Sequence, residues 1–283
     1  MELAELNRAE SYDPTVKASA FNGFLNLEGA LDRDDIAFLI SRCKSNFQQA
    51  DAIPSYLLID HLGSECFKKI QQLVQDAVGE DVFYLNDFYI YTDENAQAHW
   101  HVDTELFTFE RAYNAWILLS PDMAESPLAI LKGKNDSNDN YFHAVKVADG
   151  ECKFGNYKNG CSTVETLDHV ESNKVAAPNV AVGDVLLLDP RKFHKTNIKA
   201  PKHAIAIKFV AKGARGFRSC MQVPSMLWPE TKVFNTILKH ADNWDNVIAY
   251  IRSALTQPKE REALSGGFFP ERLSLYREKV AEL

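Results

Sequence analysis

Residues 182–197 have the sequence VGDVLLLDPRKFHKTN, and this stretch decides the fold that we expect. Gly183-Asp184 is typical of a tight turn, and the run Val185–Leu188 is typical of a buried strand. His194 follows in the next short loop or strand. Outward from here, Asp, Asn, Gly and Pro clusters separate further short candidate strands. These lie at 82–91, 97–103, 113–119, 127–131, 142–147, 174–177, 184–189 and 203–211. Such a pattern predicts a sandwich, barrel or jelly roll.

Helical patterns flank this β-rich middle on both sides. Asp32 has the character of an N-cap before a helix over 33–49, and a second helix over 64–78 stops at Gly79. After Pro224 the helical pattern returns. The expected helices there are 229–240, 243–256 and 270–281.

We expect residues 1–283 to form a single domain, because no change of composition marks a boundary. Residues 1–80 would be an N-terminal strand and helix buttress, 81–212 the catalytic core and 213–283 a C-terminal helical extension. This extension is expected to cover a pocket or to form a homodimer contact.

Charge and composition exclude several classes of protein. With 31 Lys and Arg against 39 Asp and Glu the net charge is −8, which argues against nucleic-acid binding. There is no run of 18 apolar residues and no signal pattern at the start, so we expect a cytoplasmic protein without a membrane partner. Five cysteines without a CxxC motif argue against a disulfide framework.

The most informative motif is Ala98–Asp103, with the sequence AHWHVD. Residues i and i+2 of a strand share a face, so His101 and Asp103 would point into one cavity. His194 follows 91 residues after Asp103. Two histidines and one carboxylate leave three coordination positions open, which is the ligand set of non-haem Fe(II) oxygenases.

A competing ligand set imitates the two cupin motifs. It consists of His99, His101, Glu105 and His194, and it would serve a metal dioxygenase that does not use 2-oxoglutarate. Glu105 has the same strand parity as Asp103, so parity alone does not decide between the two sets. The gap of about 90 residues between the two motifs is longer than is usual in compact cupins, and it therefore favours the set with Asp103.

The chain resembles the Fe(II)/2-oxoglutarate-dependent oxygenases, nearest their phytanoyl-CoA hydroxylase-like branch. The resemblance runs from Phe21 to Lys212. It rests on FNGFLNLEGALDRDDIAFLI from residue 21, HVD at 101–103, AYNAWILLSP at 112–121, SPLAILKGKN at 126–135 and VGDVLLLDPRKFHKTN at 182–197. It implies a mainly β fold with flanking helices, namely a double-stranded β-helix (jelly roll) core with N- and C-terminal helices packed around it.

The resemblance also implies the chemistry. His101, Asp103 and His194 would hold Fe(II), with 2-oxoglutarate and O₂ as cosubstrates. The expected reaction oxidises a C–H bond of a small molecule, such as an amino acid or a specialised metabolite, while 2-oxoglutarate is decarboxylated to succinate. Related halogenases have Gly or Ala in place of the carboxylate ligand, so Asp103 favours hydroxylation.

Members of the family also hold the distal carboxylate of 2-oxoglutarate with a cation, usually Arg, 9–17 residues beyond the last histidine. No Arg lies there in this chain, and Lys208 is the first candidate because a buried lysine needs an anion. Lys202 is a second candidate, but it follows Pro201 in an expected loop, where its ammonium would be solvated. Further expected contacts to the cosubstrate are Thr196, Asn197 and Tyr89.

A non-enzymatic interpretation remains beside these two. A jelly roll with a relic site would act as a binding or scaffold module. The absent arginine favours this interpretation, and the complete set of metal ligands argues against it.

Overall fold

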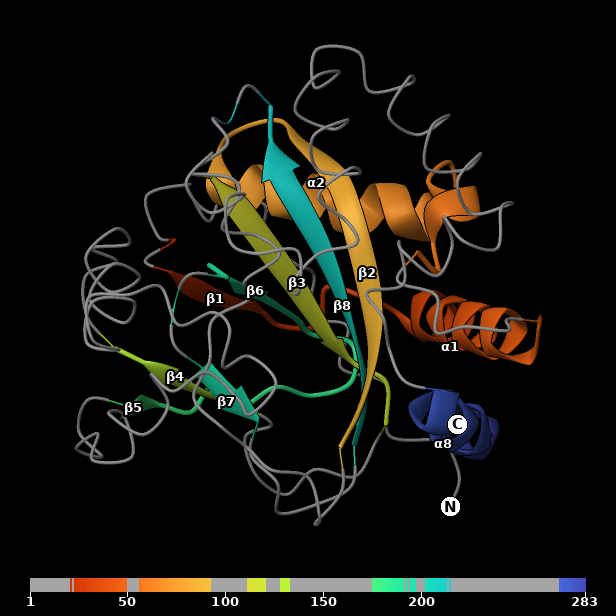
Figure 1. Ribbon diagram of the computed structural model, residues 1–283. Coiled ribbons are helices and arrows are strands. Elements are labelled where there is room, and N and C mark those ends of the chain that lie inside the picture. Colours follow the sequence, from red (N-terminus) through yellow and green to blue (C-terminus); the bar gives the residue numbers. More distant parts are fainter. Residues whose placement is uncertain are drawn as a thin grey trace, which may run out of the picture.

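The computed structural model describes residues 21, 23–49, 56–92, 111–120, 128–132, 175–190, 192, 194–196, 202–212, 214 and 270–283. Their strands form two antiparallel sheets (Figure 1). The larger sheet has the order β1 (Phe24–Leu27), β6 (Val185–Leu188), β3 (Ala112–Leu118), β8 (Lys202–Ala211), β2 (Val82–Thr92). The smaller has the order β5 (Val175–Ala176), β4 (Leu128–Leu131), β7 (His194–Thr196).

The connectivity is that of a jelly roll. Strands that neighbour each other in the larger sheet are remote in sequence, as where β8 lies between β2 and β3. The chain crosses from one sheet to the other between β3 and β4, between β5 and β6, and on either side of β7. This alternation between two antiparallel sheets is typical of a jelly roll. The expected strands at 97–103 and 142–147 lie outside the described residues.

An apolar cluster joins the facing sides of the two sheets. We call it the interior cluster, and its buried members are Trp116, Leu118, Leu128, Ile130, Val180, Leu186, Leu188, Ala204 and Ala206. Directly paired residues of antiparallel strands project to the same face. The pairings of Trp116 and Leu118 with Ala206 and Ala204 therefore define the interior face of β3 and β8.

Helices cover the opposite face of the larger sheet. Helix α1 (Arg33–Gln49) and α2 (Glu65–Val78) contribute Leu39, Ile70 and other residues to a core shared with outward-facing residues of β2, β3, β6 and β8. In Figure 1, α2 crosses behind β2 and β8, and α8 (Pro270–Glu282) lies next to α1. Arg277 donates a hydrogen bond from Nε to the carbonyl oxygen of Phe47 at 2.9 Å, which ties α8 to α1.

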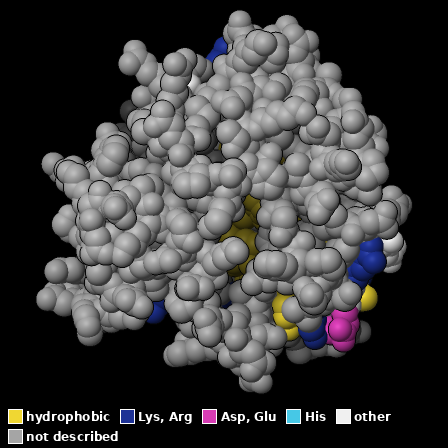
Figure 2. All heavy atoms as spheres, in the orientation of Figure 1, with side chains coloured by type: hydrophobic (Ala, Val, Ile, Leu, Met, Phe, Trp, Pro, Cys, Tyr) yellow, Lys and Arg dark blue, Asp and Glu magenta, His cyan; other side chains and the backbone are white. Residues whose placement is uncertain are grey.

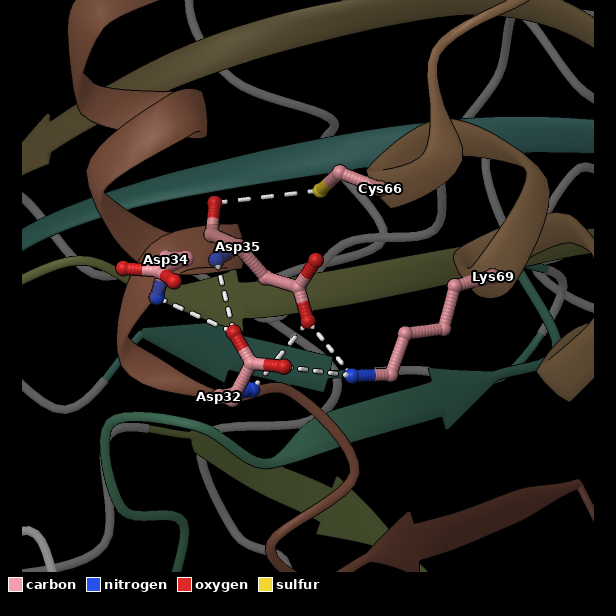
Figure 3. A network of polar contacts seen from close by, with 5 residues as sticks. All are labelled: Asp32, Asp34, Asp35, Cys66 and Lys69. Carbon is pink, nitrogen blue, oxygen red and sulfur yellow. Dashed lines mark hydrogen bonds and ion pairs between the residues drawn. The ribbon is translucent and has the colours of Figure 1, made fainter.

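The first turn of α1 is fixed by its own acidic residues and by one lysine of α2 (Figure 3). Oδ1 of Asp32 accepts hydrogen bonds from the backbone N–H groups of Asp34 and Asp35, both at 3.0 Å, which confirms the predicted N-cap. Lys69 Nζ lies 2.6 Å from Asp35 and 3.1 Å from Asp32. These contacts join the starting turn of α1 to α2.

Most elements match the sequence expectation within one or two residues. Helix α1 has the expected bounds, and α2 begins after Ser64, whose hydroxyl accepts from Phe67 N. Gly79 ends α2 in the left-handed conformation, with φ 73°. The expected helices at 229–240 and 243–256 lie outside the described part of the chain. None of the described helices is long and apolar enough to span a membrane.

The turn at Gly183 and Asp184 fixes β6 against β1. The carboxylate of Asp184 accepts from Gly29 N at 2.8 Å, Ala181 N at 2.9 Å and Asn26 Nδ2 at 3.0 Å. Gly183 has φ 98°, and a Cβ added there would lie 2.9 Å from the carbonyl oxygen of Leu31. Only glycine satisfies both conditions without strain.

We therefore expect Gly183→Ala to lower the free energy of unfolding by about 2 kcal/mol or more, through positive-φ strain and the backbone clash. Chemical denaturation monitored by circular dichroism measures this loss. Gly63→Ala is the matched control, because a Cβ there meets no atom within 4 Å, and its effect should stay within about 0.5 kcal/mol. Equal stability of the two variants would contradict this account of the turn.

Asp87 connects β2 to the segment before α2 on the helix-covered face. Its carboxylate accepts from Leu57 N at 2.8 Å, Leu58 N at 2.9 Å and the Tyr84 hydroxyl at 2.6 Å. Burial nevertheless raises the pKa of Asp87 to about 6, because desolvation outweighs these three donors. A folded-state pKa above the unfolded value favours the protonated form. The stabilising contribution is thus complete below about pH 4 and is lost as the pH rises through 6.

Asp87→Asn removes this titration and turns an amide N–H toward one of the backbone donors. We expect the variant to be less stable than the parent, with a stability difference that is largest near pH 4. The difference should narrow by about 2–3 kcal/mol on going to pH 8. Urea denaturation of both proteins across this range measures it. A difference independent of pH would show that Asp87 does not titrate as described.

Candidate functional site

His194 begins β7 and faces the interior between the two sheets. It pairs with Ile130 of β4, a member of the interior cluster, and its residue surface is 5% exposed. Nδ1 lies 2.9 Å from the carbonyl oxygen of Lys192, so it carries the proton and donates it to this oxygen. The lone pair is then on Nε2, which is the tautomer that a metal ligand needs.

The backbone that holds His194 is itself fixed by Gly23. Lys192 N donates to Asp189 O at 2.9 Å, and Asp189 N donates to Gly23 O at 2.8 Å. The side chain of Lys192 runs directly over Gly23, where an added Cβ would lie 1.8 Å from Cε. Burial lowers the pKa of Lys192. The strand before α1 thus helps to orient the carbonyl oxygen that accepts from His194.

The other residues predicted to hold the metal or to contact the cosubstrate divide into two groups. Thr196 lies on β7 and pairs with Leu128, so it shares the interior face with His194. His101, Asp103 and Asn197, like the cupin candidates His99 and Glu105, lie outside the described residues. Within the described residues, no three His, Cys, Asp or Glu side chains gather in a metal-binding group.

Lys208 lies on the interior face of β8, in the middle of a polar row. Asn86 of β2 and Asn114 of β3 pair with it from either side, so all three side chains project to the same face. We call Asn86, Lys208 and Asn114 the polar row. Each member is at most 3% exposed. The Lys208 ammonium lies 4.6 Å from the ring centre of Phe88, a favourable cation–π contact.

A β-bulge in β2 directs Asn86 to the interior. Tyr84 pairs with Phe209 and Asn86 pairs with Lys208, so two steps along β2 match one step along β8. Without this irregularity, Asn86 would share the helix-covered face with Tyr84. In the interior, neither Nδ2 nor Oδ1 of Asn86 has a hydrogen-bond partner, although both atoms are buried. Only the register of the bulge reveals the direction of this orphaned amide.

Lys202 differs from the expectation. It is the first residue of β8 and is 1% exposed, so the prediction of a solvated loop lysine was wrong. Pairing with Thr92 at the end of β2 extends the sheet to this position, and the side chain projects to the buried interior face. Burial lowers the pKa of Lys202 to about 8. Oγ1 of Thr92 is also buried without a hydrogen-bond partner.

Tyr89 lies on the opposite side of the sheet from the polar row. Its ring packs edge-on against Phe47 of α1 and Tyr276 of α8, and its hydroxyl lies 2.5 Å from Nδ1 of His203. The expected contact with the cosubstrate therefore does not fit this placement. Asn86 and Tyr89 are three residues apart, so strand alternation alone separates their faces.

Figure 2 shows apolar side chains at the centre of one face of the molecule, over β3 and β8, and charged side chains beside α8. The apolar surroundings matter for the site. A lysine or an amide placed among such side chains interacts more strongly with a charged partner than it would in water.

No family model matches the chain, and no curated protein matches it. Among solved structures it is similar to the non-heme alpha ketoglutarate dependent epimerase SnoN from nogalamycin biosynthesis (TM-score 0.46, 14% identity, covering 74% of this chain and 88% of that one). EctD from S. alaskensis with bound Fe gives TM-score 0.46 and 16% identity, covering 71% and 77%. HygX from Streptomyces hygroscopicus with nickel and 2-oxoglutarate bound gives 0.45 and 15%, covering 68% and 84%. These low similarities leave the function to be argued from the chain's own residues.

We expect His194→Ala to weaken Fe(II) binding by at least about 10–100-fold, since losing even a group that orients a metal ligand costs this much. Anaerobic isothermal titration calorimetry measures the affinity. His61→Ala is the control, because His61 lies in the short helix Ile59–His61 beside Arg42, on the helix-covered side of the larger sheet. Iron binding by His194→Ala at the parent affinity would remove His194 from the ligand set.

Proposed function

We propose that this chain is a non-haem Fe(II)/2-oxoglutarate-dependent oxygenase that hydroxylates a C–H bond of a small molecule. His101, Asp103 and His194 would hold the iron. With 2-oxoglutarate and O₂, the iron supplies the oxidising chemistry, in which the cosubstrate becomes succinate and CO₂ while one oxygen atom enters the substrate.

The observation that carries the proposal is the combination of His194 with buried cations inside one jelly roll. His194 donates through Nδ1 to a backbone carbonyl and keeps the Nε2 lone pair for a metal. On the facing sheet, β8 carries Lys202 and Lys208 on its interior face. A metal that binds a dicarboxylate needs a cation for the far carboxylate, and a buried lysine gains most from such an anion.

The protein's own residues would bind, orient and dehydrate the reactants. The hydrogen bond from His194 to Lys192 fixes the imidazole plane before metal arrives. One of the two β8 lysines would pair with the distal carboxylate: Lys208, which the sequence suggests, or Lys202, which is equally buried and lies beside the orphaned hydroxyl of Thr92. The interior cluster would exclude water from the reacting atoms.

The proposal predicts that the purified protein, with Fe(II) and O₂, converts 2-oxoglutarate to succinate, and that one lysine variant loses this cosubstrate. We expect Lys202→Met or Lys208→Met to weaken 2-oxoglutarate binding by more than about tenfold, which corresponds to one charge-assisted hydrogen bond. Anaerobic calorimetry measures the affinity, and mass spectrometry measures succinate. Lys195→Met is the control, because Lys195 pairs with Ala129 and faces away from the interior.

Two outcomes would replace the proposal. Iron binding without any affinity for 2-oxoglutarate would favour the cupin set with His99 and Glu105. Neither iron nor 2-oxoglutarate binding, by a protein that unfolds cooperatively, would favour the scaffold interpretation.

A further inference from the structure

We propose that Lys192 is a positioning residue of the metal site: the aliphatic part of its side chain, packed on Gly23, keeps His194 in the orientation that a metal ligand needs. The inference rests on the proposed function for the role of His194. It adds a residue that acts through His194 without touching the metal. It also assigns the effect to the aliphatic chain of the lysine rather than to its charge.

The carbonyl oxygen of Lys192 is the acceptor that orients the His194 imidazole. Nδ1 of His194 lies 2.9 Å from this oxygen. Such an acceptor sets both the tautomer and the ring plane of a histidine that binds metal. Whatever fixes the backbone of Lys192 therefore also fixes the direction of the lone pair on Nε2 of His194.

A tight turn fixes the backbone that leads to this carbonyl. Lys192 N donates to Asp189 O at 2.9 Å, and Pro190 lies between them. Asp at the first position and Pro at the second position are favoured in such turns, because the proline ring restricts φ. Asp189 N in turn donates to Gly23 O at 2.8 Å. The turn is thereby tied to the residue just before β1.

The side chain of Lys192 makes a second contact with the same glycine. A Cβ added to Gly23 would lie 1.8 Å from Cε and 2.7 Å from Cδ of Lys192, so the lysine occupies the space that a side chain at residue 23 would take. Lys192 is 4% exposed. Gly23 has φ 88°, which also favours glycine. Lys192 is thus held through both its backbone and its side chain, and its carbonyl oxygen has little freedom to swing.

The test separates the aliphatic chain from the charge. Lys192→Ala removes the chain, whereas Lys192→Met keeps a chain that reaches equally far along the contact and loses the ammonium. Lys195→Ala is the matched control, because it shortens a nearby lysine that pairs with Ala129 and faces away from the interior. The probe is Co(II) alone, which accepts imidazole and carboxylate ligands and has visible bands that report their geometry. Calorimetry measures the affinity, and thermal unfolding measures stability separately.

We expect Lys192→Ala to weaken Co(II) binding about tenfold or more, while Lys192→Met and Lys195→Ala stay within about twofold of the parent. The visible bands of the metal-saturated Lys192→Ala protein should also shift, which a mere loss of stability would not produce. Parent-like affinity and bands in Lys192→Ala would overturn the inference. An equal loss in Lys192→Ala and Lys192→Met would overturn it too, since the charge would then be responsible.

Gly23→Ala tests the same contact from its other side. The added Cβ displaces the lysine chain, so Lys192→Ala should weaken Co(II) binding by less than about twofold further in this background. The positive-φ strain of Gly23→Ala is present in both members of that comparison and cancels. Losses of affinity that multiply independently would overturn the role of Gly23. Where Gly23→Ala does not fold, the Lys192 variants decide alone.

The metal-free protein gives a readout that does not depend on the proposed function. At a pH at which the histidines are neutral, the imidazole ¹H–¹⁵N spectrum shows which nitrogen of His194 carries the proton, and His194→Ala assigns the signal. We expect Nδ1–H in the parent and in Lys192→Met, and a mixture with Nε2–H in Lys192→Ala. The proposed function fails separately, when the parent binds no metal. The spectrum then decides, and an unchanged tautomer in Lys192→Ala overturns the inference.

Discussion

The buried carboxylate of Asp184 holds together the part of the fold from which the site is built. Its hydrogen bonds to Gly29, Ala181 and Asn26 join the turn before β6 to the strand and turn before α1. This fixes β6 between β1 and β3, and the chain leaving β6 is again bound to Gly23 before it reaches His194. The position of the histidine therefore follows from contacts with the first described strand.

The larger sheet separates two different environments. Its outer face meets α1 and α2 through a conventional apolar core, in which Asp87 is satisfied by three protein donors. Its interior face also carries apolar residues, but Asn86 and Thr92 leave polar atoms there without protein partners. Within the single strand β2, the protein thus satisfies the polar group on the outer face but not the polar atoms of Asn86 and Thr92 on the interior face.

The helix ends and most strand positions could be predicted from the sequence, because they depend on residues close together in the chain. The bounds of α1 and α2 follow from Asp32, Ser64 and Gly79, which act within one helical turn, and most strand positions follow from apolar segments between turn residues. The burial of individual side chains could not be predicted where it depends on how remote strands pair. Lys202 was expected in solvent because of the preceding proline, but pairing with Thr92 buries it.

The direction of Asn86 shows the same limit. Alternation counted from Tyr84 assigns Asn86 to the helix-covered face, and only the bulge reverses this. Burying the unsatisfied Asn86 amide costs stability in the protein alone. The bulge places this amide level with Lys208 of the adjacent strand, so its surroundings depend on how β2 pairs with β8. The sequence of β2 alone does not specify that pairing, and this is the physical reason why the interior face is harder to predict than the helix-covered face.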